Sequence, residues 1–475
     1  MSNSSSTRPM YLHSAIELAT LIKTGVTTSR AVTELFLERI HTHTHLNAFT
    51  LVCAERALAL ADNADRLQQA GIRLSPLHGV PVALKEHFQW AGTIAHYGSK
   101  ARADMVSDHN SALVNQLMGL GMVILGKTSM TEFAFGLSGQ NPSFGTAKNP
   151  WHATEHRAPG GSSSGAGVAV SMGLAPLVLG GDTGGSVRAP AALNHTVGYK
   201  PTSGLLSRSH CMPLCETLDV LGPISHTVAD ARLITQLLAT PELEDEATLA
   251  TAAMRTQKAL RQNAIAPSQS HLYYLSEAAW PATLQPAAYA NWLDTLALLR
   301  QNGWTLTPWT PQDLAFFTNL GNHNSTILAY EAYQAQGHYA EDLQAPMWAV
   351  VRARIMNGKA ITQTAHQDAL NIRQQVMATF NQTFPQGAVL LMPAIDQGAQ
   401  VLDAEDTNHI GLGQLLRPAN FLGIPAINLP TGLDQDGMPL ALQLLAHQHQ
   451  DVLLLAMAEA LEPSLPDTRL APPSA

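Results

Sequence analysis

The chain has 475 residues, of which 45% are hydrophobic and only 13% are charged. This composition predicts a large buried core. The formal net charge is -9, from 27 basic and 36 acidic residues, and this balance opposes a broad nucleic-acid-binding surface, which needs clustered lysine and arginine. No segment approaches the ~18 consecutive apolar residues that span a bilayer.

Three cysteines, at positions 53, 211 and 215, make neither a disulfide framework nor a zinc-binding pair of motifs. The first residues contain no apolar core of a secretory signal. We therefore expect a cytoplasmic protein that binds neither nucleic acid nor a membrane. A homodimer is compatible with this composition.

The first half of the chain predicts alternating helices and strands after a disordered tail at residues 1–10. Apolar residues recur at helical spacing from Ser14 to Ile40, and residues 27–29 (Thr-Thr-Ser) divide this stretch into two helices. Further helices are expected at 54–70, 111–120 and 165–172, with another beginning within 131–136, and strands at 79–84, 122–125 and 174–179. This alternation is typical of the α/β class with a mostly parallel or mixed sheet.

The second half changes in character. Residues 240–385 are rich in Ala, Gln, Leu and Trp, which predicts a mainly helical, variable region. Strands are expected at 389–392, 424–429 and 438–445, the last two as a hairpin, and a closing helix at 451–461. Without repeats or long linkers, we expect residues 11–475 to form one large domain, with a central mixed β-sheet covered by helices on both faces. Its parts are a motif core at about 75–235, the variable region, and closing strands and helix at 386–462.

Two glycine–serine loops carry the densest chemical pattern, at 160–165 and 180–188. Ser186 follows a predicted strand and precedes a helix expected to begin at Arg188, where Pro190 suits the first turn. An isolated Gly-Gly-Ser turn would indicate a simple connection, but the second loop and a nearby lysine favour catalysis. Glycine permits turns whose amides converge on an anionic oxygen. We expect unpaired amides at Thr183, Gly184 and Gly185.

Lys85 ends the apolar run at 79–84. A nucleophilic serine needs a base, and burial lowers the pKa of a lysine, so that its neutral amine accepts a proton. A lone lysine at this position would more simply extend into solvent. Together with the two serine loops, it indicates a catalytic base.

These motifs, taken together, resemble those of the amidase signature family. The resemblance covers most of the chain outside about 240–385. It rests on GGSSSG, GDTGGSVRAPAA and KPTSG, on PLHGVPVALKE, GKTSMTEFAFG and FGTAKNPW before and between them, and on the C-terminal PANFLGIPAINLPTGLDQDGMPLALQLL.

The resemblance implies a catalytic triad in which Lys85 is the base, Ser162 the bridging residue and Ser186 the nucleophile. It also implies a cis peptide before Ser162 and an oxyanion hole formed by the amides of Thr183, Gly184, Gly185 and Ser186. Ser163, Asp182 and Arg188 are expected to support the loop, the last two as an ion pair.

The function implied is hydrolysis of a small-molecule amide, or a related C–N acyl bond, through an acyl-enzyme, with no metal and no organic cofactor. Three alternatives stay open: a glutamine-hydrolysing subunit of a tRNA-dependent amidotransferase, an esterase or carbamate hydrolase, and an inactive binding protein on the same scaffold. Free glutamine needs a carboxylate for its α-amino group, and where the family's acid falls, this chain has Gly413.

Two segments leave the shape of the pocket open. Glu86 and His87 follow the lysine where the family commonly has Asp, and for His87 we expect a packing role. The aromatic residues of 309–348 either line an apolar acyl pocket or pack in the core; the first alternative favours aryl or aliphatic amides over charged ones.

Two further patterns match other enzyme classes only formally. Residues 121–128 match a P-loop, but their spacer reads as the strand itself, which leaves no backbone cradle for phosphate. Gly161, Ser163 and Gly165 match the elbow of α/β-hydrolases, but the polar residues before them predict no preceding strand.

Overall fold

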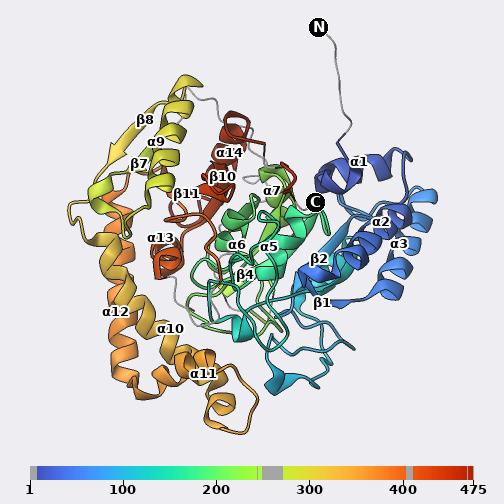
Figure 1. Cartoon of the computed structure of the whole chain (residues 1–475), viewed down its shortest axis with the longest axis horizontal. Helices are drawn as coiled ribbons and strands as arrows, with labels where there is room; N and C mark the ends of the chain where they lie inside the picture. Colours follow the sequence, from blue (N-terminus) through green and yellow to red (C-terminus); the bar gives the residue numbers. More distant parts are fainter. Residues whose placement is uncertain are drawn as a thin grey trace.

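The computed structural model describes residues 8–242, 244–245, 247–248, 271–402, 410–467 and 469–473. Within them the strands form one 11-stranded mixed sheet in the order β1-β3-β2-β4-β6-β5-β10-β11-β9-β7-β8, with helices packed on it (Figure 1). The predicted α/β class is confirmed. The strands are β1 (Phe49–Val52), β2 (Pro81–Lys85), β3 (Val123–Thr128), β4 (Leu177–Asp182), β5 (Val197–Lys200), β6 (Val220–Ser225), β7 (Leu272–Leu275), β8 (Leu306–Trp309), β9 (Val389–Pro393), β10 (Ala426–Leu433) and β11 (Pro439–Leu445).

Helices are found close to the predicted ranges 14–40, 54–70, 111–120, 165–172 and 451–461, whereas those at Val228–Leu238 and Ile410–Phe421 were not predicted. They are α1 (Ala15–Lys23), α2 (Ser29–Thr42), α3 (Ala54–Gln69), α4 (Ala112–Gly119), α5 (Ser164–Ser171), α6 (Arg188–Leu193), α7 (Val228–Leu238), α9 (Pro286–Gln301), α10 (Phe316–Glu341), α11 (Ala349–Met356), α12 (Gln363–Thr383), α13 (Ile410–Phe421) and α14 (Asp451–Leu461). None of those that the structure describes is long and apolar enough to cross a membrane.

Side-chain caps fix where the first helices begin. Ser14 and Glu17 form a reciprocal capping box at α1. The Thr28 side chain accepts a hydrogen bond from the amide of Ala31 at the start of α2, as its position in the sequence predicts. These caps satisfy amide groups that the first turn of a helix otherwise leaves unpaired.

The strand order places the ends of β2 and β4 side by side. These two strands are parallel neighbours, with Leu84 opposite Leu179, and β2 is also parallel to β3. Their carboxyl ends therefore meet at one edge of the sheet, which is where loops of parallel sheets form binding sites. Lys85 is the last residue of β2, and Asp182 is the last residue of β4.

Three expectations change. The region predicted to be mainly helical also contributes two strands, β7 and β8, which extend the sheet through parallel pairing with β9 and with each other. The helix expected to begin within 131–136 is a short 3-10 helix, Glu132–Ala134, because Phe133 and Ala134 have left-handed backbone angles. The tail predicted at 1–10 falls largely outside the described residues, and a 3-10 helix begins at Met10.

Candidate active site

Lys85 is buried at the end of β2, with 1% of its surface exposed. Its Nζ donates a hydrogen bond to Ser162 Oγ over 2.8 Å and lies 3.4 Å from the carbonyl oxygen of Gly181. Burial lowers the pKa of Lys85 to about 7, although the charges of Asp219 and Asp182 act in the opposite direction. A large fraction of this amine is therefore neutral near pH 7.

The loop that carries Ser162 is held against the loop that carries Ser186. The peptide bond between Gly161 and Ser162 is cis, as the family resemblance implies. The Ser163 amide donates to the Ser186 carbonyl oxygen over 3.3 Å, and Ser163 Oγ donates to the Gly181 carbonyl oxygen over 3.3 Å. Ser163 thus joins the two glycine–serine loops.

Ser186 lies between the end of β4 and the start of α6, with 3% of its surface exposed. Within the described part of the chain, no hydrogen bond joins its Oγ to Ser162 Oγ. Two hydrogen bonds are expected in the triad, and the structure contains the one between Lys85 and Ser162. The Ser186 loop is held nearby through its backbone, by the hydrogen bond from the Ser163 amide.

The amides of the Ser186 loop differ in what they bind. The Gly185 amide donates to Asp182 Oδ1 over 2.7 Å. The prediction that this amide is unpaired is therefore wrong. The reason is that the Asp182 carboxylate folds back toward the amides of its own loop. The amides of Thr183, Gly184 and Ser186 donate to no acceptor among the described residues. Three of the four amides expected to form an oxyanion hole are thus available.

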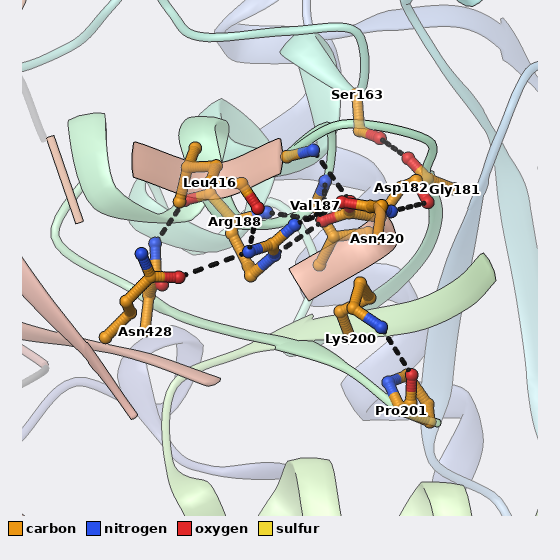
Figure 2. A network of polar contacts seen from close by, with 12 residues as sticks. Ser163, Gly181, Asp182, Val187, Arg188, Lys200, Pro201, Leu416, Asn420 and Asn428 are labelled. Carbon is orange, nitrogen blue, oxygen red and sulfur yellow. Dashed lines mark hydrogen bonds and ion pairs between the residues drawn. The ribbon is translucent and has the colours of Figure 1, made fainter. Parts of the chain in front are cut away.

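Asp182 and Arg188 form a buried, bidentate ion pair beneath the loop (Figure 2). The Arg188 Nε and Nη2 atoms each lie 3.0 Å from an oxygen of Asp182. Burial alone would raise the pKa of Asp182, but the charge and hydrogen bonds of Arg188 hold it well below its usual range. The expected loop-supporting ion pair is present.

The network extends to residues that sequence reasoning left without a role. Asn420 on α13 donates to Asp182 Oδ1 over 2.9 Å and accepts from Arg188 Nη2 over 2.6 Å. Arg188 also donates to the Leu416 carbonyl oxygen over 2.8 Å. Lys200 is buried nearby and donates to the Pro201 carbonyl oxygen. Asn420 and Lys200 lie in the PANFLGIP and KPTSG motifs, which could have identified them.

A cavity of about 650 Å³ lies beside Lys85. Its wall includes Lys85, His87 and Thr183, together with charged residues at 208, 216 and 245, and Ser186 is not part of it. Asp219, for which the sequence gives no indication, also lines it and accepts hydrogen bonds from Thr183 Oγ1 and from the amides of Leu214 and Cys215. Met212, Leu214 and Leu221 also line it, so the wall of this cavity is mixed, whereas the pocket considered from the sequence was apolar.

The aromatic residues of 309–348 do not line this cavity. Trp309, Phe316 and Phe317 belong to the hydrophobic core: Trp309 and Phe316 pack against Phe380, and Phe317 packs against Trp309 and Phe316. Of the two alternatives for these three side chains, core packing is the one found.

His87 is buried on the wall of the cavity, stacked edge-to-face on Phe88 at 4.4 Å between ring centroids. Neither ring nitrogen has a hydrogen-bond partner among the described residues. Burial, together with the nearby charge of Lys85, lowers the pKa of His87 well below its usual value, which keeps the ring neutral.

The two formal motif matches do not form the corresponding sites. Strand β3 runs through Gly126–Thr128, so the backbone there pairs with β2 instead of curling around a phosphate. The residues before Ser163 form no strand, and Ser163 stands immediately before α5.

Comparisons with known proteins extend over nearly the whole chain. The Amidase family model matches residues 31–455. A glutamyl-tRNA(Gln) amidotransferase subunit from Symbiobacterium thermophilum is 32% identical over 477 residues, covering 94% of this chain and 96% of that protein. A crystal structure of an amidase has a TM-score of 0.84 at 26% identity and covers 95% of this chain and 100% of its own.

A peptide amidase in complex with chymostatin has a TM-score of 0.80 at 25% identity, covering 97% of this chain and 98% of its own. The family model spans the motif core, the variable region and almost all of the closing elements. The chain therefore belongs to the amidase signature family and is a hydrolase acting on C–N bonds.

Proposed function

We propose that this protein hydrolyses a small-molecule amide through Ser186, Ser162 and Lys85. Ser186 Oγ attacks the carbonyl carbon, Ser162 takes the Ser186 proton, and the Ser162 proton passes to neutral Lys85. The amides of Thr183, Gly184 and Ser186 stabilise the oxyanion. The relay then runs in reverse to protonate the leaving amine, and a water molecule hydrolyses the acyl-enzyme by the same route.

The observation that carries this proposal is the hydrogen bond between Lys85 Nζ and Ser162 Oγ, made by a lysine whose pKa is lowered to about 7. A lysine with its usual pKa would be almost wholly protonated at neutral pH and would not accept a proton. A proton relay requires a neutral amine hydrogen-bonded to a hydroxyl, and burial of Lys85 next to Ser162 supplies it. A lysine with a purely structural role has no such requirement.

The proposal is tested by turnover of a panel of anilides, primary amides, carbamates and esters by the wild type and three variants. Ser186→Ala and Lys85→Ala are expected to lose about 10⁴-fold or more in kcat, and Ser162→Ala somewhat less. Glu34→Gln, which changes an exposed pair on α2, is the control and should keep wild-type turnover. Wild-type turnover by Ser186→Ala overturns the proposal.

A second candidate is the glutamine-hydrolysing subunit of a tRNA-dependent amidotransferase, which the identity to such a subunit favours. One feature of the site opposes it. The family's acidic partner for the α-amino group of glutamine falls at position 413, where this chain has glycine, and a Cβ atom there would meet the guanidinium of Arg417. A cation repels an ammonium group. Strong glutaminase activity, or co-purification with a partner protein, would favour this candidate. The esters and carbamates in the panel test the second alternative, an esterase or carbamate hydrolase, and turnover of any substrate excludes the third, an inactive binding protein.

A further inference from the structure

The cavity beside Lys85 lies on the side of the site from which the leaving amine is protonated. In the proposed mechanism this amine receives its proton from Ser162, so its nitrogen must come within hydrogen-bonding distance of Ser162 Oγ. Lys85, whose Nζ lies 2.8 Å from that oxygen, lines the cavity, whereas Ser162 and Ser186 do not. A substituent on the leaving nitrogen therefore has this space of about 650 Å³ to occupy.

The wall of the cavity carries more negative than positive charge among the described residues. Asp182 lines it too, but its charge is neutralised by Arg188. Besides Lys85, the other charged side chains of the wall are four carboxylates and one guanidinium: Glu216, Asp219, Glu244, Asp245 and Arg208. Arg208 donates from Nη1 to the backbone carbonyl oxygen of Glu216 and forms no ion pair with a described carboxylate. The cavity therefore attracts cations and repels anions.

Asp219 is the carboxylate of this wall that lies deepest in the site. Its oxygens accept hydrogen bonds from Thr183 Oγ1 and from two backbone amides, which fix the orientation of the carboxylate. No basic side chain that the structure describes forms an ion pair with it, although Lys85 and Arg208 are close enough for their charges to interact with it. Burial raises the pKa of Asp219, and a cation in the cavity would lower it again.

His87 is a second polar side chain of this wall that lacks a partner. It is 4% exposed, and neither ring nitrogen has a hydrogen-bond partner among the described residues. The ring is held by its edge-to-face contact with Phe88 and by Gly181, on which a Cβ atom would lie 2.6 Å from His87 Nε2. A neutral imidazole has one nitrogen that accepts a hydrogen bond, and leaving it unpaired in a buried site is unfavourable. A cationic donor in the cavity would satisfy it.

Three apolar side chains complete the wall: Met212, Leu214 and Leu221. All three are at least nine-tenths buried. Burial of methylene groups against such side chains is favourable. The wall thus suits a short hydrocarbon chain that ends in a positive charge.

We propose that the cavity binds the amine half of a substrate with a second, positively charged amino group, so that the enzyme cleaves N-acyl diamines. Asp219 pairs with the ammonium group, and His87 accepts a hydrogen bond from it. This inference rests on the proposed amide hydrolysis and specifies its substrate class. The acyl C–N bond breaks and a C–O bond to water forms. Both protons of the water end on the leaving nitrogen, so that the products are a carboxylate and a diammonium ion.

The test compares amides of equal length whose amine half ends in an ammonium or in a methyl group. The pairs are N-(3-aminopropyl) with N-butyl, N-(4-aminobutyl) with N-pentyl, and N-(5-aminopentyl) with N-hexyl amides, all with the acyl group that the panel shows to be hydrolysed fastest. At about pH 8 an alkylamine, whose pKa is near that of lysine, is charged. We expect the wild type to prefer at least one ammonium-bearing amide by a factor of about 10–100 in kcat/KM.

A further pair places the charge on the acyl side: N-propyl-5-aminopentanamide and N-propylhexanamide. The wild type should prefer neither by more than about twofold, because the cavity receives the amine half. A preference for the ammonium in this pair alone overturns the assignment of the cavity to the leaving group.

Three variants assign the preference to residues. Asp219→Asn keeps an acceptor for the backbone amides but removes the charge, and should reduce the preference to within about twofold, mainly through KM. His87→Leu removes no hydrogen bond to a described residue and should reduce it by about 2–10-fold. Glu244→Gln neutralises a carboxylate whose side chain is 72% exposed and is the matched control, with the preference within about twofold of wild type. Each preference is a ratio within one variant, so a changed basal rate does not affect it.

The contrary outcomes are equally specific. Equal rates for every pair with the wild type, or an undiminished preference in Asp219→Asn, overturn the inference. A loss in Glu244→Gln as large as in Asp219→Asn shows that the general field of the wall attracts the cation, and overturns the assignment to Asp219. If Asp219→Asn does not fold, the wild-type pairs and His87→Leu decide, and an undiminished preference in His87→Leu then counts against the inference.

A binding measurement separates this inference from the proposed function. Calorimetric titration with 1,3-diaminopropane, 1,4-diaminobutane and 1,5-diaminopentane, each against the monoamine of equal length (butylamine, pentylamine or hexylamine), requires no turnover. We expect the wild type to bind at least one diamine about tenfold more tightly than its monoamine, and Asp219→Asn to lose the difference. Equal binding within every pair, or binding of none, overturns the inference even if neutral amides are hydrolysed. Failure of the proposed function would instead appear as an absence of turnover of every amide, with diamine binding intact.

Discussion

Lys85 Nζ donates a 2.8 Å hydrogen bond to Ser162 Oγ at the buried carboxyl end of β2. In this orientation the lysine is the donor and the serine oxygen the acceptor. For the proposed relay the direction reverses, with Ser162 donating to a neutral amine. The proposed relay therefore requires that Lys85 be neutral in the active enzyme.

The first prediction concerns pH. The pKa of Lys85 is lowered from 10.5 to about 7, so the amine becomes protonated, and loses its ability to accept a proton, as the pH falls through about 7. The rate, measured as kcat/KM between pH 5 and 9, should therefore decrease about tenfold per pH unit below that value and level off above it. An unchanged rate across this range would contradict the role of Lys85 as base.

The second prediction concerns the ion pair under the loop. Asp182→Asn leaves the buried Arg188 guanidinium without its counter-charge, which costs about 3–5 kcal/mol. The variant should unfold at clearly lower denaturant concentration than the wild type. Glu34→Gln, which breaks an exposed pair with Arg30, should shift the midpoint by an amount equivalent to less than about 1 kcal/mol. Equal midpoints for Asp182→Asn and the wild type would show that the pair does not stabilise the fold.

The third prediction compares two adjacent glycines. Gly185 has a φ of +119°, and a methyl group there would lie 2.7 Å from the Leu416 side chain. Gly184 has no such backbone angle, and its methyl group would meet only the flexible Arg417 side chain at 3.3 Å. Gly185→Ala should therefore lower the melting temperature clearly more than Gly184→Ala. The reverse order in thermal melts would contradict the packing of α13 on the loop.

The fourth prediction tests the role of the aromatic residues in the variable region. Phe317 is buried and packs edge-to-face with Trp309. Phe317→Ala should destabilise the protein by about 3–5 kcal/mol and leave KM for any hydrolysed amide within about twofold. The two readouts are chemical denaturation and steady-state kinetics at a temperature where the variant is folded. A large change in KM at unchanged stability would instead indicate that Phe317 lines the substrate pocket.

Much of the site could be predicted because its residues follow one another in recognisable motifs. Lys85 ends an uninterrupted apolar run, which predicts a buried strand, and Ser162 and Ser186 stand in glycine-rich loops. The sequence does not show that Asp182 captures the Gly185 amide, because that depends on how the carboxylate turns within the loop. Nor does it show Asp219 beneath Thr183, because no local pattern surrounds that residue.

Two strands in the variable region could not be predicted from the sequence, for a different reason. Strands β7 and β8 are each four residues long, too short for an alternating pattern to stand out from the helices around them. β7 is stabilised by pairing with β9, which begins more than 110 positions beyond Leu275 in the chain, and β8 joins the sheet by pairing with β7. The position of Arg417 against Gly184 likewise depends on contact between segments far apart in sequence.

The identity of the nucleophile is tested most directly by covalent labelling with a fluorophosphonate probe, followed by intact-mass analysis and peptide mapping. The proposed nucleophile predicts one adduct per chain, located on Ser186, absent in Ser186→Ala and formed much more slowly in Lys85→Ala. Undiminished labelling of Ser186→Ala, or an adduct mapped to a different residue of the wild type, would contradict the proposal that Ser186 is the nucleophile.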